Sequence, residues 1–344
     1  KRWALFSRTH ELDHMAESDL VIETVSMDPD LKQKALVEIE KRVGSETVIA
    51  ANTSFLPISR IAADAHHKER VVGMHYYAPV HRVPLVELIA PEGVADWALH
   101  TAHDFARKQG KTVIQVRDRP GFYTTRILFR YLHEALILVG QGVDIAQIDE
   151  TMKDFGYSSG PMALMDEMGL DVVNRVDKFM AEAMGERWPE PFEALGRLID
   201  AGFLGRKNGR GFYTYPEGKK RKRRPNREVF KYVRKTKPKY ADRREIRERL
   251  VFSKIHEAAR CLEEDVIASP EDGDVGAVLG SGFPPFLGGP FHYADSLGMD
   301  VLVRGLEDWA RQGCAHYAPA QILRDMARRG KLFFHASPSY RKRK

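Results

Sequence analysis

The first third of the chain alternates short apolar runs with stretches in which apolar residues recur every three or four positions. The run at 20–25 is apolar except for Glu23, which is typical of a strand buried on both faces of a sheet. Four further apolar runs predict strands at 48–51, 71–75, 85–89 and 113–116. The stretches between them predict helices at 29–43, 57–63 and 95–109. This alternation predicts an α/β domain built on a parallel, doubly wound sheet.

The first of these helices carries signals at both ends. Asp28 can cap the free N–H groups of the first turn, and Pro29 suits the first helical position. Gly44 is a residue type that commonly ends a helix. These signals support the predicted helix at 29–43.

From residue 120 onward the pattern is helical. Apolar residues form a broad stripe on the first predicted helix, at positions 127, 128, 131, 132, 135, 136 and 139. Asp144 with Gln147 predicts a capping box for a second helix, which ends at Gly156. Beyond further helices, the remaining landmarks are a glycine-rich turn at 205–211, one long helix at 244–264 and a tight loop at 280–289. One sheet domain followed by two helical lobes is the predicted plan.

Composition fits a globular protein of 344 residues with 43% apolar and 30% charged positions. The most apolar predicted helix, at 127–139, contains Arg130, His133 and Glu134, so we expect no membrane span. The cysteines Cys261 and Cys314 lie far apart, and neither they nor the histidines show metal-binding spacing. We therefore expect no metal site and a reducing, cytoplasmic location.

The net charge of +6 comes from two basic segments. Residues 219–239 hold twelve lysines and arginines against the single acid Glu228, and four more basic residues form the tail at 341–344. The rest of the chain is acidic. Such a segment can contact nucleic acid or an anionic membrane. Because no aromatic stacking pattern accompanies the charge, we favour a solvated linker and expect neither nucleic acid nor membrane as a partner.

His75 and Glu87 are candidates for a catalytic pair. Each lies in one of two short predicted strands joined by a turn that contains Pro79, so the strands can bring the two side chains together. A carboxylate on one imidazole nitrogen fixes the tautomer and makes the other nitrogen a better base. A His–Glu pair with a purely structural role would show the same spacing, so the spacing alone leaves both roles open. Ser54 follows the strand at 48–51, and in such sheets ligands bind where strands reach their carboxyl edge.

Seven motifs point to a family. They are DLVIE at 19–23, ANTSFLPIS at 51–59, GMHYYAPVHRVPLVELI at 73–89, RDRPGFYTTRILF at 117–129, GPMALMDEMGLD at 160–171, GRKNGRGFYTY at 205–215 and GFPPFLGGPFHYADSLG at 282–298. Together they resemble the L-3-hydroxyacyl-CoA dehydrogenase family, most closely the dehydrogenase part of the bacterial multifunctional fatty-acid oxidation protein. The resemblance covers almost the whole chain. It implies NAD-dependent oxidation of L-3-hydroxyacyl-CoA to 3-oxoacyl-CoA in β-oxidation, and a homodimer or a place in a larger β-oxidation complex.

The resemblance also implies a division of the chain. It indicates a partial, Rossmann-like NAD-binding domain at 1–117, a first helical C-terminal dehydrogenase domain at 118–216, a basic linker at 217–240, a second helical C-terminal dehydrogenase domain at 241–335 and a basic tail at 336–344.

Residue roles follow from the same resemblance. His75 is expected to take the proton of the substrate hydroxyl, with Glu87 orienting it, while Ser54 and Thr125 complete the catalytic set. The positions expected to touch NAD are Val25, Ser26, Met27, Lys32, Ser54 and Ala78.

The chain departs from the family pattern at several points. Residues 1–24 contain no strand followed by a Gly-x-Gly-x-x-Gly turn, the unit that binds the pyrophosphate of a dinucleotide. Met27 stands where an acid is usual, and Ala78 and Thr125 each replace an Asn. Two interpretations follow: a dehydrogenase that is part of a longer multifunctional protein, or a degenerate homologue that keeps the fold, with or without acyl-CoA binding, and performs no hydride transfer.

Overall fold

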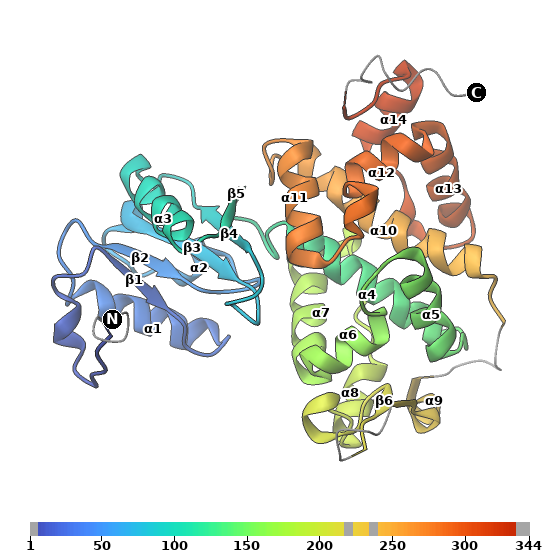
Figure 1. The fold of residues 1–344 in the computed structure, drawn as a ribbon, viewed down its shortest axis with the longest axis horizontal. Coiled ribbons are helices and arrows are strands. Elements are labelled where there is room, and N and C mark those ends of the chain that lie inside the picture. The colour runs from blue at the N-terminus through green and yellow to red at the C-terminus, as the bar shows by residue number, and fades with distance from the viewer. Residues whose placement is uncertain (1–5, 217–222, 234–239, 335–344) are drawn as a thin grey trace. The chain divides into compact units, whose positions relative to one another are not determined.

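The computed structural model describes residues 6–216, 223–233 and 240–334 (Figure 1). The chain divides into two compact units, Lys1–Phe122 with Val266–Ala268 and Tyr123–Asp265 with Ser269–Lys344. The predicted basic tail and two parts of the predicted linker, 217–222 and 234–239, lie outside the described residues. The fold class inferred from the sequence is confirmed: a sheet with helices, followed by a helical region.

The N-terminal unit is built on a five-stranded sheet with strand order β1-β2-β3-β4-β5. All five predicted strands form, as β1 Leu20–Glu23, β2 Val48–Ala51, β3 Val71–Tyr76, β4 Leu85–Ala90 and β5 Thr112–Arg117. One part of the prediction is wrong, because β3 and β4 pair antiparallel while the other neighbours are parallel. The connection at 77–84 is too short for the crossover that a parallel pair requires.

Helices cover both faces of this sheet (Figure 1). They are α1 Pro29–Glu40, α2 Ile58–Ile61 and α3 Asp96–Lys108, with short 3₁₀ turns η2 Leu12–Met15 and η3 Lys68–Arg70. The alanines of α3 pack on Val72 and Met74 of β3. Gly73 faces the other way, where Ile58 of α2 lies so close that a Cβ would overlap it. Because side chains alternate along a strand, His75 shares the Gly73 face.

Asp28 caps α1 as predicted, accepting a hydrogen bond from the Leu31 N–H at 2.9 Å. The helix ends at Glu40, a few residues before the predicted end. In the second unit Asp144 likewise caps its helix, and half of the predicted capping box forms, because the Asp144 Oδ1 accepts the Gln147 backbone N–H at 3.2 Å. Gln147 donates its side-chain amide to the Ala241 carbonyl at 2.7 Å instead of returning to the cap.

The second unit is helical. Its helices are α4 Thr124–Gly140, α5 Ile145–Phe155, α6 Pro161–Met168, α7 Leu170–Met184, α8 Ala194–Asp200, α9 Phe230–Val233, α10 Arg243–Glu263, α11 Pro270–Ser281, α12 Pro290–Leu297, α13 Met299–Arg311 and α14 Gln321–Arg329. Short 3₁₀ turns are η4 Gly185–Arg187, η5 Arg206–Asn208, η6 Arg227–Val229, η7 Pro285–Leu287 and η8 Ala315–Tyr317. Helix α10 confirms the long helix predicted there, and it packs along α4. Within the described ranges, no helix has the length and apolar character needed to cross a bilayer.

Part of the predicted linker is folded onto this unit. Strand β7 Arg224–Pro225 pairs antiparallel with β6 Tyr213–Thr214. Further along, the Tyr232 carbonyl accepts a hydrogen bond from the Arg197 side chain at 2.9 Å. Residues 224–233 are therefore tied to the helical unit rather than extending away from it.

The glycine-rich turn at 205–211 closes around Asp166. The two oxygens of this buried carboxylate accept the backbone N–H groups of Phe212 and Tyr213, at 2.9 and 2.8 Å. Burial raises the Asp166 pKa to about 6 despite these bonds. Glycine at 211 leaves the carboxylate room, because a Cβ there would overlap Asp166 Oδ1. These glycines thus serve a structural turn.

Gly211→Ala is expected to destabilise the chain by about 1–3 kcal/mol, because the added methyl group must displace the Asp166 carboxylate from its hydrogen bonds. Urea unfolding measures the change. Gly196→Ala is the matched control, since Gly196 lies inside α8 and a Cβ there meets no atom within 4 Å. That control should gain about 0.5–1 kcal/mol from helix propensity. An equal response of the two variants would contradict the role of Gly211.

Candidate active site

His75 and Glu87 lie directly opposite each other on β3 and β4. The antiparallel pairing of these strands brings the His75 Nδ1 to 2.7 Å from the Glu87 Oε2. Both residues are buried, His75 with 5% of its surface exposed and Glu87 with none. The contact predicted between an imidazole and a carboxylate is therefore present. With Nδ1 donating to the carboxylate, Nε2 carries the lone pair and can accept a proton.

Tyr77 adds a second donor to the same carboxylate. Its hydroxyl donates to the Glu87 Oε2 at 2.6 Å, and its ring centroid lies 4.3 Å from that of His75. Phe122 lies on the imidazole as well, with ring centroids 6.2 Å apart. The sequence analysis missed Tyr77, although residues i and i+2 of a strand share one face and so placed it beside His75. Together these contacts fix the imidazole against its carboxylate.

A buried ion pair organises the carboxyl end of β1. Lys32 of α1 donates to the Glu23 Oε2 at 3.0 Å and to the Asn52 carbonyl at 2.8 Å, and both charged side chains are almost fully buried. Glu23 also accepts the N–H of Val25. The prediction that Lys32 touches the cofactor stays a prediction; in the structure its ammonium is enclosed between the ends of β1 and β2. It positions the loop that follows Glu23.

The remaining predicted cofactor residues gather at one edge of the sheet. Because β1, β2 and β3 run parallel, their carboxyl ends lie together. Asn52 links two of these ends, since its side-chain oxygen accepts the Tyr76 N–H at 3.3 Å. The residues predicted to contact NAD that follow these strands are Val25, Ser26 and Met27 after β1, Ser54 after β2 and Ala78 after β3. Thr125, in contrast, is buried at the start of α4 in the helical unit.

Asp118 holds the segment that carries Ser54. Its carboxylate oxygens accept the N–H groups of Ile58 and Ser59, both at 2.7 Å, at the start of α2. The Phe55 carbonyl accepts the Gly121 N–H at 3.0 Å. The segment between β2 and α2 is therefore anchored to the residues that follow β5. The sequence signal that could have pointed to Asp118 is its position, as an acidic residue directly after strand β5.

The residues at this edge fit one half of a dinucleotide. Val25 is an apolar side chain 36% exposed and followed in the chain by Ser26, and the Glu23 bond to its N–H holds the loop around it. An exposed apolar side chain with a nearby hydroxyl suits a planar ring and its ribose. Residues 6–122 as described contain no strand–glycine-turn–helix unit of the kind that holds a pyrophosphate. The edge therefore fits a nucleoside half of NAD, a planar ring with its ribose.

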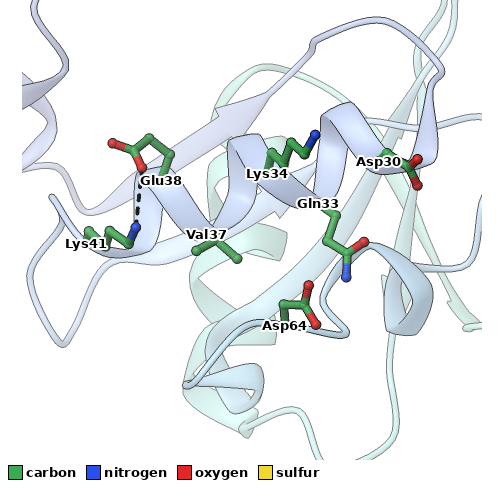
Figure 2. A pocket seen from close by; sticks show the side chains of 7 residues that line it. All are labelled: Asp30, Gln33, Lys34, Val37, Glu38, Lys41 and Asp64. Carbon is green, nitrogen blue, oxygen red and sulfur yellow. Dashed lines mark ion pairs between the residues drawn. The ribbon is translucent and has the colours of Figure 1, made fainter.

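An open groove of about 390 Å³ runs along α1 (Figure 2). Its lining is Asp30, Gln33, Lys34, Val37, Glu38, Lys41 and Asp64. Acids and lysines are mixed there, and none of the predicted site residues takes part. In the described part of the chain, no group of three His, Cys, Asp or Glu side chains could hold a metal ion.

Comparison with known families identifies both units. The family described as "3-hydroxyacyl-CoA dehydrogenase, NAD binding domain" matches residues 1–119. The family described as "3-hydroxyacyl-CoA dehydrogenase, C-terminal domain" matches 121–215 and 246–335. The chain belongs to the 3-hydroxyacyl-CoA dehydrogenase family. The resemblance read from the seven motifs is confirmed, as are membership of an oxidoreductase family and NAD as its cofactor.

Individual members of the family support this assignment. The chain is 44% identical to the fatty acid oxidation complex subunit alpha of Shewanella amazonensis over 97% of its own length and 47% of the relative. It therefore spans about half the length of the curated relatives it matches. Escherichia coli 3-hydroxybutyryl-CoA dehydrogenase shares the fold, with a TM-score of 0.80 at 22% identity, over 93% of this chain and 83% of that one. The dehydrogenase part of C. elegans multifunctional enzyme 1 aligns with a TM-score of 0.63 at 25% identity, over 91% and 72% of the two chains.

Proposed function

We propose that this chain oxidises L-3-hydroxyacyl-CoA to 3-oxoacyl-CoA with NAD, and that His75 is the general base. The observation that carries the proposal is the 2.7 Å contact between the His75 Nδ1 and the Glu87 Oε2, in a unit that matches an NAD-binding family domain. Family membership supports the reaction class. The retained pair favours a dehydrogenase over a homologue without hydride transfer.

His75 performs the proton step in this proposal. Its Nε2 has no hydrogen-bond partner among the described residues, so it is available to the substrate's 3-hydroxyl. As the C–O bond becomes a carbonyl, the hydroxyl proton passes to Nε2, and Glu87 stabilises the imidazolium that forms. NAD supplies the acceptor for the hydride that leaves C3. Ser54 is proposed to hold the reacting oxygen, and Thr125 is proposed as a member of the catalytic set with a hydroxyl in place of the usual amide.

The helical unit is proposed to contribute to acyl-CoA binding and to a homodimer. Membership of a larger β-oxidation complex is proposed from the relatives whose name contains "complex subunit alpha".

The decisive measurement is NADH formation from a series of L-3-hydroxyacyl-CoA substrates, with the D-isomers as controls. No NADH formation with any L-substrate at saturating NAD would refute the activity.

Glu87→Gln is expected to lower kcat by about 10- to 100-fold, the range typical of a partner that orients a reacting histidine. The amide can still accept a hydrogen bond from Nδ1, but it carries no charge to stabilise the imidazolium. The loss should therefore appear in kcat, with the substrate KM little changed. Tyr77→Phe is the milder companion, since it removes one hydrogen bond from the same carboxylate and leaves its charge in place. A kcat within a few-fold of the native value in Glu87→Gln would remove Glu87 from the mechanism.

A further inference from the structure

Helices α4 and α10 bury a series of charged side chains between them. Arg126, near the start of α4, donates its Nε to the Glu257 Oε1 at 2.8 Å. About two turns further along α4, the Glu134 Oε1 accepts a hydrogen bond from the Arg249 Nε at 2.7 Å. These contacts show that the helices run antiparallel, and each of these two arginines has a carboxylate partner.

Arg130 lies between these two pairs and has no such partner. Only 1% of its surface is exposed, and neither its Nε nor its Nη2 has a hydrogen-bond partner among the described residues. Across the described ranges, no carboxylate lies within ion-pair distance of it. Its guanidinium carbon lies 5.2 Å from the ring centroid of Trp188, whose buried Nε1 is also without a partner.

Helix α10 presents two more unsatisfied groups to the same place. The Nδ1 of fully buried His256 and the Nη1 of Arg260, one turn further along, both lack hydrogen-bond partners in the described structure. Burial lowers the His256 pKa well below its ordinary value, and the charges of Arg260 and Arg130 add to this effect. The His256 Nε2 accepts the Ala320 N–H at 3.0 Å, so a neutral ring carries its proton on Nδ1.

Around Arg130 and Arg260, the arginines outnumber the carboxylates that could neutralise them. The nearest acids are already engaged, because Glu257 binds Arg126, Glu264 binds both Arg126 and Arg187, and Glu134 binds Arg249. Arg130 and Arg260 keep an excess of two positive charges. A buried guanidinium without a counter-charge is strongly destabilising, and clustered donors without acceptors indicate a missing anion or water.

We propose that Arg130, Trp188, His256 and Arg260 form a binding site for a small oxyanion, with inorganic phosphate as its ligand. Two guanidinium groups supply charge and forked donors, the geometry that suits phosphate oxygens. The indole and imidazole N–H groups supply two further donors. Arg260 is partly exposed, so this end of the group of donors can be reached from solvent. This site is independent of the proposed dehydrogenase reaction.

Isothermal titration of the whole chain with inorganic phosphate, in a buffer without other oxyanions, tests the proposal. We expect one phosphate per chain, a shift in tryptophan emission that is lost in Trp188→Phe, and binding at least about 100-fold weaker in Arg130→Met. Arg304→Met, which removes an exposed arginine from α13, is the matched control and should bind as the native chain does.

Three results would overturn the proposal. The first is no phosphate binding by the native chain, which would indicate that water occupies the donors. The second is equal binding by Arg130→Met and Arg304→Met. The third is binding of CoA without binding of inorganic phosphate, which would assign the donors to a phosphate of the acyl carrier. Because the native chain alone decides the first and third outcomes, misfolding of a variant leaves the test intact.

Discussion

His75→Gln is expected to lower kcat for oxidation of L-3-hydroxyacyl-CoA by about 10²- to 10⁴-fold, the contribution typical of a positioned general base. Glutamine can occupy the space and can donate a hydrogen bond to Glu87, but it offers no basic nitrogen to the substrate hydroxyl. The substrate KM should change little, because the step that is lost is proton transfer. Initial rates of NADH formation measure both constants.

His67→Gln is the matched control for this prediction. It changes the same residue type in the same unit, but the His67 side chain is 62% exposed, and among the described residues its ring is hydrogen-bonded to Glu69 at the surface. Its kcat should equal that of the native chain. Thermal unfolding of both variants shows whether the fold is kept. Turnover by His75→Gln within a few-fold of the native rate would remove His75 from the mechanism.

The strands of the N-terminal unit could be predicted because burial dictates their composition. A strand such as β2, with every residue buried, must be a continuous apolar run, and such runs are visible without a structure. The direction of β4 was harder to predict, because an apolar run reads the same in either direction. Only the length of the connection at 77–84 distinguishes the two cases.

The candidate site was predictable where its residues follow strand ends. His75, Glu87 and Ser54 are polar residues in or just after apolar runs, so their placement follows from the fold class. The Lys32 contact was not predictable. Its place on the predicted helix face did not reveal that the carbonyl of Asn52 and the carboxylate of Glu23 would enclose its ammonium.

Buried polar groups in the helical unit escaped the sequence analysis for a related reason. Arg130 and His133 appeared there only as charges that interrupt an apolar helix. In the structure both are buried, His133 against Asp177 at 2.7 Å and Arg130 against Trp188. Partners from distant parts of the chain decide which charges an apolar helix can bury, and helical periodicity carries no information about them.

Lys254 of α10 is the clearest case of a buried charged residue that the sequence did not reveal, and its effect on stability should be large. The side chain is fully buried, donates to the Ser281 carbonyl at 2.9 Å, and lies 5.2 Å from the ring of Tyr157 and 5.8 Å from that of Phe283. In the described structure it forms no ion pair. Burial lowers its pKa to about 7, against 10.5 in the unfolded chain. By linkage this difference corresponds to about 5 kcal/mol.

The direction in which stability changes with pH follows from the lowered pKa of Lys254. Above about pH 10.5 the amine is neutral in both states and opposes folding least. As the pH falls towards 7 the unfolded chain gains a proton that the folded chain binds poorly, so stability decreases; below about pH 7 the loss is complete. Lys254→Met, which keeps the length and removes the charge, should therefore stabilise the chain by about 1–4 kcal/mol near pH 6. This advantage should shrink steadily towards pH 10.

Urea unfolding across this pH range measures the difference between the variant and the native chain. Lys178→Met is the matched control, because Lys178 is an exposed lysine on helix α7, and it should change stability by less than about 0.5 kcal/mol at every pH. A stability difference for Lys254→Met that does not vary with pH would mean that the amine is equally protonated in both states. The variant would then act through packing alone, and the neutral amine inferred from burial among Tyr131, Tyr157 and Phe283 would be wrong.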